Sequence, residues 1–259
     1  MIEYSSKIIF LGTGTGVPSA DRSSSSVLLR LMGANLLIDL GPGTLRQLAK
    51  VSITVAEIDY IFLTHLHPDH SADLASFLFA SKYPPYLKNR TPFHLLAGSD
   101  FETFHKGLKN LYGHWIELPE GLFKSILLPQ DEPWEKTFSL FSVESLPMTH
   151  TSSSLGYRIT LPDRKVLVFS GDSDYSDSLV KLAQKADLLV LECSFPEGRK
   201  VEGHLIPSLA GRIAREAGVK QLALTHFYPE CQGEDLIGPC GREYGGPVKL
   251  AEDFLTILL

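Results

Sequence analysis

Cysteine, basic residues and long apolar runs are all scarce in this chain of 259 residues. Its 3 cysteines cannot build the disulfide framework of a small secreted domain, and we expect them to stay reduced. No run approaches the roughly 20 apolar residues that cross a bilayer, and the first residues lack the basic region of a signal peptide. Lys and Arg number 24 against 30 Asp and Glu, and this net charge of −6 does not favour nucleic-acid binding. These absences predict a cytoplasmic protein.

The remaining composition is that of a globular protein with a full core. Hydrophobic residues make up 44% of the chain and charged residues 21%, which excludes intrinsic disorder. No repeat, low-complexity tract or linker divides it, so we predict one domain over residues 1–259. Strands are expected at 7–11, 26–31, 35–40, 58–64, 93–97, 122–128, 138–142, 155–161, 166–170, 188–192, 221–225 and 248–251. Helices are expected at 43–50, 72–81, 99–111 (with Ser99 as N-cap), 175–185 and 208–217.

The most informative stretch is Thr-His-Leu-His-Pro-Asp-His at 64–70. It follows a nearly continuous apolar run, typical of a strand covered on both faces, so its polar side chains emerge where a strand ends. Three imidazoles and one carboxylate are ligands that Zn²⁺ accepts. His65 and His67 lie two apart in an extended segment, so they point the same way and can hold one ion. Asp69 and His70 follow the proline and can face a second ion.

Three further residues of ligand type stand just past the carboxyl ends of expected strands. They are His150, Asp172 and His226. Any one of them alone is more often a core histidine or a helix-capping aspartate than a metal ligand. Together with the segment 64–70, however, they supply the number of ligands that a metal cluster requires.

These motifs resemble the metallo-β-lactamase-fold superfamily. The matching residues occur in the family's order: Ile38-Asp39-Leu40-Gly41, the segment 64–70, His150, Gly171-Asp172 and His226. The resemblance implies an α/β fold, namely an αββα four-layer sandwich of two central mixed sheets flanked by helices. It also implies a binuclear metal site at one edge of the sheets.

The resemblance further implies which residues hold which ion. His65, His67 and His150 would bind the first ion. Asp69, His70 and His226 would bind the second. Asp172 would bridge the two ions, and Asp39 would orient a ligand imidazole. The implied cofactor is Zn²⁺ at two ions per chain, with Mn²⁺ as the alternative. An iron-type redox branch carries Glu where this chain has His67, which argues against oxygen chemistry.

Such a site is hydrolytic. Two ions about 3.5–4 Å apart bind one water, lower its pKa towards about 7, and hold the attacking and leaving oxygens. Within the superfamily the chain is most similar to ribonuclease Z and its phosphodiesterase relatives. This similarity is carried by Phe-Leu-Gly-Thr-Gly-Thr-Gly-Val-Pro-Ser at 10–19, Leu-Leu-Val-Leu-Glu-Cys-Ser-Phe at 188–195, Gly203-His204 and Ala-Leu-Thr-His-Phe at 223–227.

The ribonuclease Z resemblance implies a catalytic group beside the metals. His204 would hydrogen-bond the scissile phosphate or protonate the leaving oxygen, and Glu192 would orient it. With Asp69, these are the catalytic residues that we expect. The alternative for His204 alone is a surface histidine that precedes a helix.

Other positions depart from the transfer-RNA-processing enzymes. The N-terminal loop has Ala20 and Ser23 where those enzymes carry Lys and Asn, although Arg22 remains. Leu205-Ile206 replaces their Ser-Thr, and the short segment 112–135 carries four Glu and one Asp where they extend a basic arm. Because an arm that grips phosphates should be cationic, efficient transfer-RNA processing is not expected. The expected substrate is a small or cyclic phosphodiester or an RNA end, and the resemblance implies a homodimer.

Other interpretations stay open at this point. A lactonase, thioesterase or β-lactamase-like enzyme would use the same ligands on a carbonyl group, and the pair Glu192 and His204 favours phosphodiesters over carbonyls. A non-catalytic scaffold is the weaker alternative, because every ligand is present. Cys231 and Cys240 either hold a structural metal or are simply reduced thiols.

Overall fold

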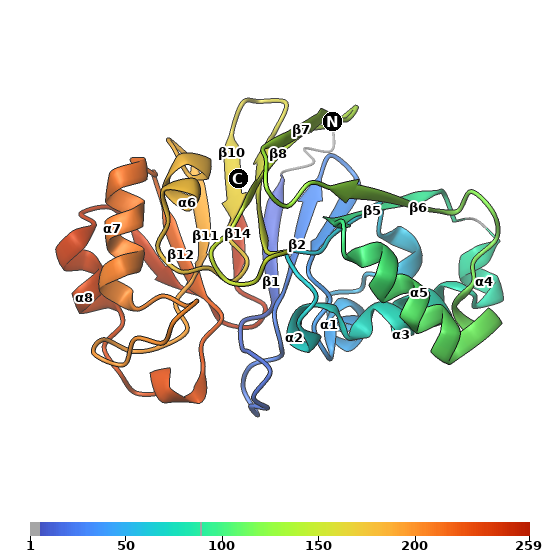
Figure 1. Cartoon of the computed structure of the whole chain (residues 1–259), viewed down its shortest axis with the longest axis horizontal. Helices are drawn as coiled ribbons and strands as arrows, with labels where there is room; N and C mark the ends of the chain where they lie inside the picture. Colours follow the sequence, from blue (N-terminus) through green and yellow to red (C-terminus); the bar gives the residue numbers. More distant parts are fainter. Residues whose placement is uncertain (1–5, 89) are drawn as a thin grey trace.

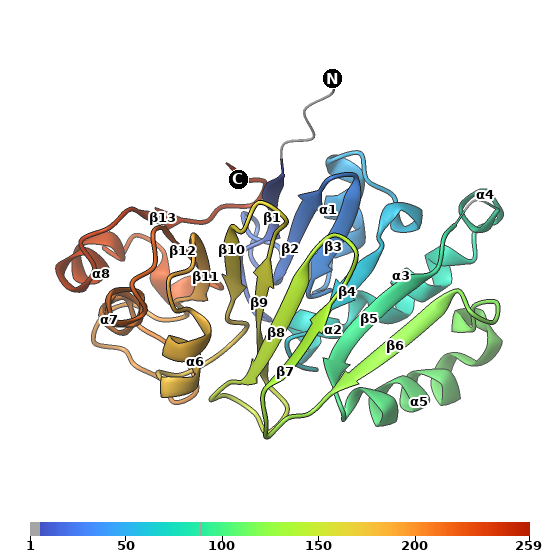
Figure 2. The same cartoon turned by 90° about the horizontal axis from the view of Figure 1, so that it is seen from above.

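Two seven-stranded sheets lie face to face in the computed structural model, which describes residues 6–88 and 90–259 (Figure 1). Helices α1 (Thr44–Lys50), α3 (Asp73–Ser81) and α5 (Phe101–Tyr112) cover one outer side, with the short α2 (Pro68–Ser71) and α4 (Pro84–Leu87). Helices α6 (Asp177–Leu182), α7 (Pro207–Ala217) and α8 (Ile237–Glu243) cover the other. From above, the sheets lie between these two groups (Figure 2). The predicted αββα four-layer sandwich is confirmed.

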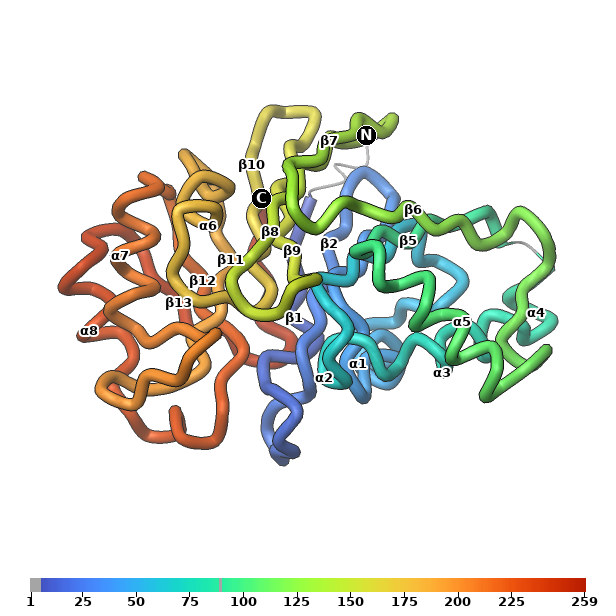
Figure 3. Tube along the Cα trace, in the orientation of Figure 1, coloured from blue at the N-terminus to red at the C-terminus, as the bar shows by residue number. Residues whose placement is uncertain are grey.

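Both sheets mix parallel and antiparallel strands. The order in the first is β14 (Thr256–Leu258), β1 (Lys7–Gly12), β2 (Ser26–Leu31), β3 (Ala34–Ile38), β4 (Tyr60–Phe62), β5 (Phe93–Gly98) and β6 (Phe123–Leu128). The order in the second is β13 (Val248–Leu250), β12 (Leu222–Thr225), β11 (Leu188–Glu192), β10 (Val166–Phe169), β9 (Leu155–Thr160), β8 (Ser142–Pro147) and β7 (Trp134–Thr137). The Cα trace completes most of the first sheet before it enters the second (Figure 3). Three 3₁₀ turns complete the described elements: η1 (Val55–Glu57), η2 (Gly113–Ile116) and η3 (Pro229–Cys231).

Successive side chains of a strand point to opposite faces of its sheet, so the apolar residues of each strand are shared between two core layers. In β1, Ile8 and Phe10 face the second sheet, whereas Ile9 and Leu11 face the helices. Because both faces are covered, these strands are apolar at consecutive positions. Burial on both sides fixes the strands rigidly, and this rigidity lets the loops at their ends hold side chains in place.

Parallel strands bring several loops to one edge. β3, β4 and β5 are parallel neighbours in the first sheet, as are β10, β11 and β12 in the second. Asp39 directly follows β3, and the segment 64–70 follows β4. Asp172 and His226 come just after β10 and β12. The expectation that the segment 64–70, Asp172 and His226 stand past strand ends is therefore correct, whereas Asp39 was expected inside the strand 35–40.

Two local predictions are wrong. Residues 138–142 were expected to form a strand, but 138–141 link β7 to β8, and the Phe138 amide donates to the Phe141 carbonyl at 2.8 Å. The two rings stack at 4.9 Å and close one end of the core, which explains the apolar pattern. Ser99 does not cap α5; its hydroxyl donates to Gln130 Oε1, and Asp100 is the N-cap.

Several elements were not expected, among them β7, β14 and α8. β7 is a mostly exposed edge strand with a polar sequence, so it carries no apolar signal. Among the described residues, none of the helices has the length and apolar character to cross a membrane.

Candidate metal centre

The segment 64–70 is folded tightly against the end of β3. Pro68 occupies the first turn of α2, where its missing N–H costs nothing. This short helix places Asp69 and His70 in one turn, and the His70 carbonyl accepts a hydrogen bond from the Leu40 amide at 2.7 Å. The backbone of the segment 64–70 is therefore held in place, which restricts where its histidine side chains can lie.

The first predicted triad is assembled. One ligand atom from each of His65, His67 and His150 lies within 4.8 Å of the others. The rings of His65 and His67 are 4.6 Å apart, and Nε2 of His150 lies 3.1 Å from Nδ1 of His67. His65 is buried and His67 is exposed, so the triad opens to solvent on one side.

The second predicted triad is assembled next to the first. Asp69, His70 and His226 also bring one ligand atom each within 4.8 Å of one another. Nε2 of His226 lies 3.2 Å from Nε2 of His70 and 3.4 Å from Oδ2 of Asp69. His226 has a positive φ of 61°, a conformation that is uncommon outside glycine and typical of functional sites.

Asp172 lies between the two triads. Its Oδ2 is 3.9 Å from Nε2 of His65 and 3.8 Å from Nε2 of His150. Its Oδ1 is 3.3 Å from Nε2 of His70 and 3.4 Å from Nε2 of His226. One carboxylate oxygen thus faces each set of imidazoles.

Hydrogen bonds at Nδ1 orient four of the imidazoles. Nδ1 of His70 donates to Oδ2 of Asp39 at 2.8 Å, and Nδ1 of His150 donates to the Gly203 carbonyl at 3.0 Å. The two other bonds join His65 to Thr64 Oγ1 at 3.1 Å and His226 to Ser194 Oγ at 2.9 Å. With Nδ1 engaged in this way, each Nε2 is directed at the centre, as in metal sites.

The close packing of these groups shifts their pKa values. Burial would raise the pKa of Asp172, but the neighbouring His226 and His70 hold it well below its usual range. Burial likewise would lower the pKa of His70, yet Asp172 and Asp39 raise it well above the ordinary value. Burial and the adjacent His70 lower the pKa of His65. The site therefore combines ionised carboxylates with imidazoles in a buried setting, which suits cation binding.

Buried polar atoms that lack a hydrogen-bond partner indicate whether the site suits metal ions. Within the described part of the chain, Nε2 of His65 and Oδ1 of Asp172 are buried and make no hydrogen bond. Such atoms are costly unless something satisfies them. Imidazole nitrogens and carboxylate oxygens are the donors that Zn²⁺ accepts. The donor atoms gathered here therefore fit the binding of a divalent cation.

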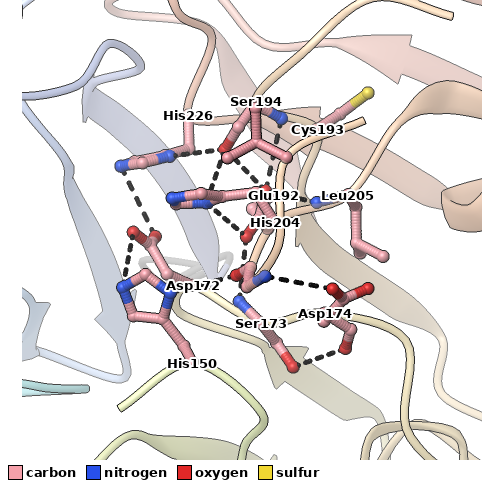
Figure 4. Close-up of polar contacts among 12 residues, drawn as sticks. His150, Asp172, Ser173, Asp174, Glu192, Cys193, Ser194, His204, Leu205 and His226 are labelled. Carbon is pink, nitrogen blue, oxygen red and sulfur yellow. Dashed lines mark hydrogen bonds and ion pairs between the residues drawn. The ribbon is translucent and has the colours of Figure 1, made fainter. Parts of the chain in front are cut away.

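Glu192 forms the hub of a second network beside this cluster (Figure 4). It is 1% exposed, and its Oε1 accepts from Nδ1 of His204 at 3.0 Å and from the Ser173 amide at 2.9 Å. Its Oε2 accepts from the Ser194 hydroxyl at 2.6 Å and from the Leu205 amide at 3.1 Å. The sequence analysis expected Glu192 to orient His204, and the structure places the two side chains in hydrogen-bond contact.

His204 joins this network to the metal ligands. A ligand atom of His204 lies within 4.8 Å of one on His150 and one on Asp172. Burial lowers the pKa of His204, but the hydrogen bond and charge of Glu192 outweigh it, so the pKa is raised. His204 is thus part of the centre and is not a free surface histidine.

A cavity of about 550 Å³ is lined by Phe227 and Tyr228, which follow His226 in the chain, and by none of the candidate metal ligands. Tyr228 lines it, and its ring lies 6.0 Å from that of His226 and 5.9 Å from that of His204. Arg22 forms another part of the wall, with its guanidinium 4.7 Å from the Phe227 ring. The cavity wall therefore combines the ring of Tyr228 and the guanidinium of Arg22 with the acidic side chains of Asp21 and Glu234.

Sequence reasoning did not identify every residue of this site. Ser194, Gly203 and Thr64 all orient ligand imidazoles, but the motifs that contain them assign them no role. The two cysteines that the sequence analysis left open are Cys231 and Cys240. Burial raises the pKa of Cys231 to about 12 and that of Cys240 to about 11. Neither thiol belongs to a group of close ligand atoms among the described residues.

Solved structures define the class of protein to which this architecture belongs. The crystal structure of the metallo-β-lactamase fold protein YhfI from Bacillus subtilis matches with a TM-score of 0.83 and 27% identity, covering 97% of this chain and 99% of that one. The short form of human tRNase Z matches with a TM-score of 0.78 and 27% identity, covering 97% and 98%. The fold is that of the metallo-β-lactamase superfamily.

Sequence comparison then gives the family. The chain belongs to the family described as Anti-Pycsar protein Apyc1, whose model matches residues 6–230. A ribonuclease Z from Brevibacillus brevis is 31% identical over 88% of this chain and 87% of its own length. The sequence prediction of a metallo-β-lactamase-fold hydrolase similar to ribonuclease Z is confirmed.

Proposed function

We propose that this protein is a phosphodiesterase that uses two divalent metal ions per chain, most simply Zn²⁺ with Mn²⁺ as the alternative. The observation that carries the proposal is the position of Asp172, which presents one oxygen to each of two imidazole-containing triads. Its distances to four Nε2 atoms, between 3.3 and 3.9 Å, leave space for a cation on each side. The ligand set is His65, His67, Asp69, His70, His150, Asp172 and His226.

The chain's own residues prepare this site. Bound divalent ions would supply an activated water molecule and stabilise the negative charge of the phosphate. Asp39 and Gly203 fix the direction of two ligand rings. Asp69 stands at the partly exposed side of the second triad, so we assign it to the catalytic group as well as to the ligands.

His204 and Glu192 favour phosphodiesters over carbonyl substrates. Hydrolysis of a diester expels an alkoxide, which benefits from a proton donor. His204 lies beside the cluster, and the buried Glu192 accepts the hydrogen bond from its Nδ1. The imidazole can therefore hold a proton at its other nitrogen, Nε2, and deliver it to the leaving oxygen.

The cavity that Tyr228 lines is large enough for a small substrate. Its volume of about 550 Å³ is within the range of small-molecule pockets. The segment 112–135 contributes η2, β6 and the start of β7 rather than a separate arm. Together these features favour a small or cyclic phosphodiester or an RNA end over a whole transfer RNA.

A panel of substrates tests this function. Purified protein supplied with Zn²⁺ or Mn²⁺ is compared on bis-nitrophenyl phosphate, a cyclic nucleotide, a homoserine lactone and nitrocefin. We expect the highest kcat/KM on one of the two phosphodiesters, and loss of that activity in Asp172→Ala. The exposed Asp163, paired with Lys165 at 3.0 Å, supplies the control variant Asp163→Ala. If the lactone or nitrocefin were the best substrate, a carbonyl-directed hydrolase would replace this proposal.

A further inference from the structure

The hydroxyl of Ser194 lies at the junction of the two networks. This residue is fully buried, and its Oγ is 2.6 Å from Oε2 of Glu192, 2.9 Å from Nδ1 of His226 and 3.2 Å from Nδ1 of His204 (Figure 4). Within the centre, a single hydroxyl thus touches a carboxylate, a metal-ligand candidate and the proton-donor candidate. None of the sequence motifs assigns it a role.

The single proton of this hydroxyl determines the direction of the hydrogen bonds. Oε2 of Glu192 is an acceptor, and the 2.6 Å distance is that of a short O–H···O⁻ bond, so the hydroxyl donates to it. Its lone pairs then accept the N–H at Nδ1 of His226. This leaves Nε2 of His226 unprotonated, as metal binding requires.

The opposite direction would disable the second triad. If Ser194 donated to Nδ1 of His226, the ring proton would sit on Nε2. That proton would then point at His70 and Asp69, whose nearest atoms lie 3.2 and 3.4 Å away. The carboxylate behind Ser194 excludes this arrangement.

Glu192 is itself held in place by the backbone. Three amides donate to it, those of Ser173, Ser194 and Leu205, at distances of 2.9 to 3.2 Å. The Glu192 carboxylate therefore keeps three hydrogen-bond donors when the Ser194 hydroxyl is removed. The direct bond between Glu192 and His204 is also independent of that hydroxyl.

We propose that Ser194 is a positioning residue that connects Glu192 to His226, so that one buried carboxylate orients both the second ion's ligand and the neighbouring proton donor. This inference rests on the proposed function, because it assumes that His226 binds an ion. It makes a specific claim: loss of the hydroxyl weakens the ion held by Asp69, His70 and His226 and spares the other.

The test is a titration of metal-free protein with Zn²⁺ in competition with a chromogenic chelator. In Ser194→Ala we expect one of the two ions to bind about 10–100-fold more weakly, the usual loss for such outer hydrogen bonds. The first ion should keep its affinity. Ser194→Thr, which keeps a hydroxyl at the same position, should restore binding of the second ion.

Ser145→Ala is the matched control. Ser145 is 1% exposed and its hydroxyl donates to the Gly156 carbonyl at 3.0 Å, so the variant also removes one buried hydroxyl bond. It should bind both ions as the wild type does. A second measurement covers the case in which threonine does not fit: the Nδ1–H signal of His226 in the ¹⁵N spectrum of zinc-loaded protein should be protected from exchange in wild type and not in Ser194→Ala.

The outcomes separate the two proposals. Unchanged affinity for both ions in Ser194→Ala, or equal weakening of both, would overturn the role of Ser194 while leaving the metal centre intact. Failure of the wild-type protein to bind a second ion would instead overturn the proposed function.

Discussion

The carboxylate of Asp39 accepts the N–H of His70 Nδ1 at 2.8 Å, and both side chains are buried beneath the metal-ligand cluster. The same carboxylate accepts from the Thr64 amide at 2.8 Å and from the Thr64 hydroxyl at 2.9 Å. Asp39 thus fixes both the start of the segment 64–70 and the ring at its end.

Asp39→Asn should therefore weaken Zn²⁺ binding by about 10–100-fold. Asparagine tolerates the left-handed backbone of this position, where φ is 62°, so the fold should persist. Chelator competition measures the affinity. Asp59→Asn is the control, since Asp59 accepts from the Asn35 amide at 2.9 Å away from the cluster. Equal affinities in the two variants would contradict the orienting role of Asp39.

Substitution of two glycines in one loop distinguishes the effect of backbone strain from the effect of displacing a metal-ligand candidate. Gly203 and Gly198 have φ of 82° and 80°. A Cβ on Gly203 would lie 3.1 Å from Nδ1 of His150, whereas one on Gly198 meets nothing within 4 Å. Both Ala variants carry a backbone cost of about 1–2 kcal/mol. We expect only Gly203→Ala to lose about 100-fold in kcat/KM, because small displacements of ligands are costly. Similar losses in both would point to strain alone.

Tyr228 should contribute to substrate binding. Its ring stacks on Phe195 at 4.7 Å and forms part of the cavity wall. An aromatic contact is worth about 1 kcal/mol, so Tyr228→Ala should raise KM for a small diester about 5-fold with less effect on kcat. Tyr228→Phe should behave like the wild type. Steady-state kinetics measures both, with Tyr83→Ala as the exposed control. A lower kcat at constant KM would place Tyr228 in the chemical step instead.

Precursor transfer RNA should be a poor substrate. The chain has a net charge of −6, and two cations in the loop between β11 and α7 are already paired, Lys200 with Asp174 at 2.6 Å and Arg199 with Glu234 at 3.7 Å. Binding a large RNA requires many free cations and is strongly salt-dependent. We expect kcat/KM for a small diester to exceed that for the precursor at low and at moderate salt. Tight, salt-sensitive binding with clean cleavage at the 3′ end would reverse this view.

Most of the site residues that could be predicted from the sequence alone were recognised because they follow an expected strand. His65, Asp172 and His226 each follow an apolar strand, and parallel pairing brings such positions to one edge. Glu192 and His204 came from the resemblance to ribonuclease Z. The contacts of His204 with Glu192 and with the ligands depend on how the loop between β11 and α7 folds over the end of its sheet, which local patterns do not encode.

The features that sequence reasoning missed depend on tertiary context. Ser194 is an ordinary serine until the fold places it between Glu192 and His226. The apolar residues Phe138 and Phe141 imitate a strand because their rings cover the core from a turn. Neither case departs from local preference strongly enough to be recognised without the structure.

The most direct test of the central claim is the metal content of the wild-type protein. Elemental analysis of folded protein, supplied with Zn²⁺ and freed of excess metal, should give about two ions per chain, as expected of seven ligands arranged around one shared carboxylate. Asp172→Ala should give about one ion or none, because both triads lose the oxygen between them. Fewer than one ion per chain in the wild-type protein would contradict the account.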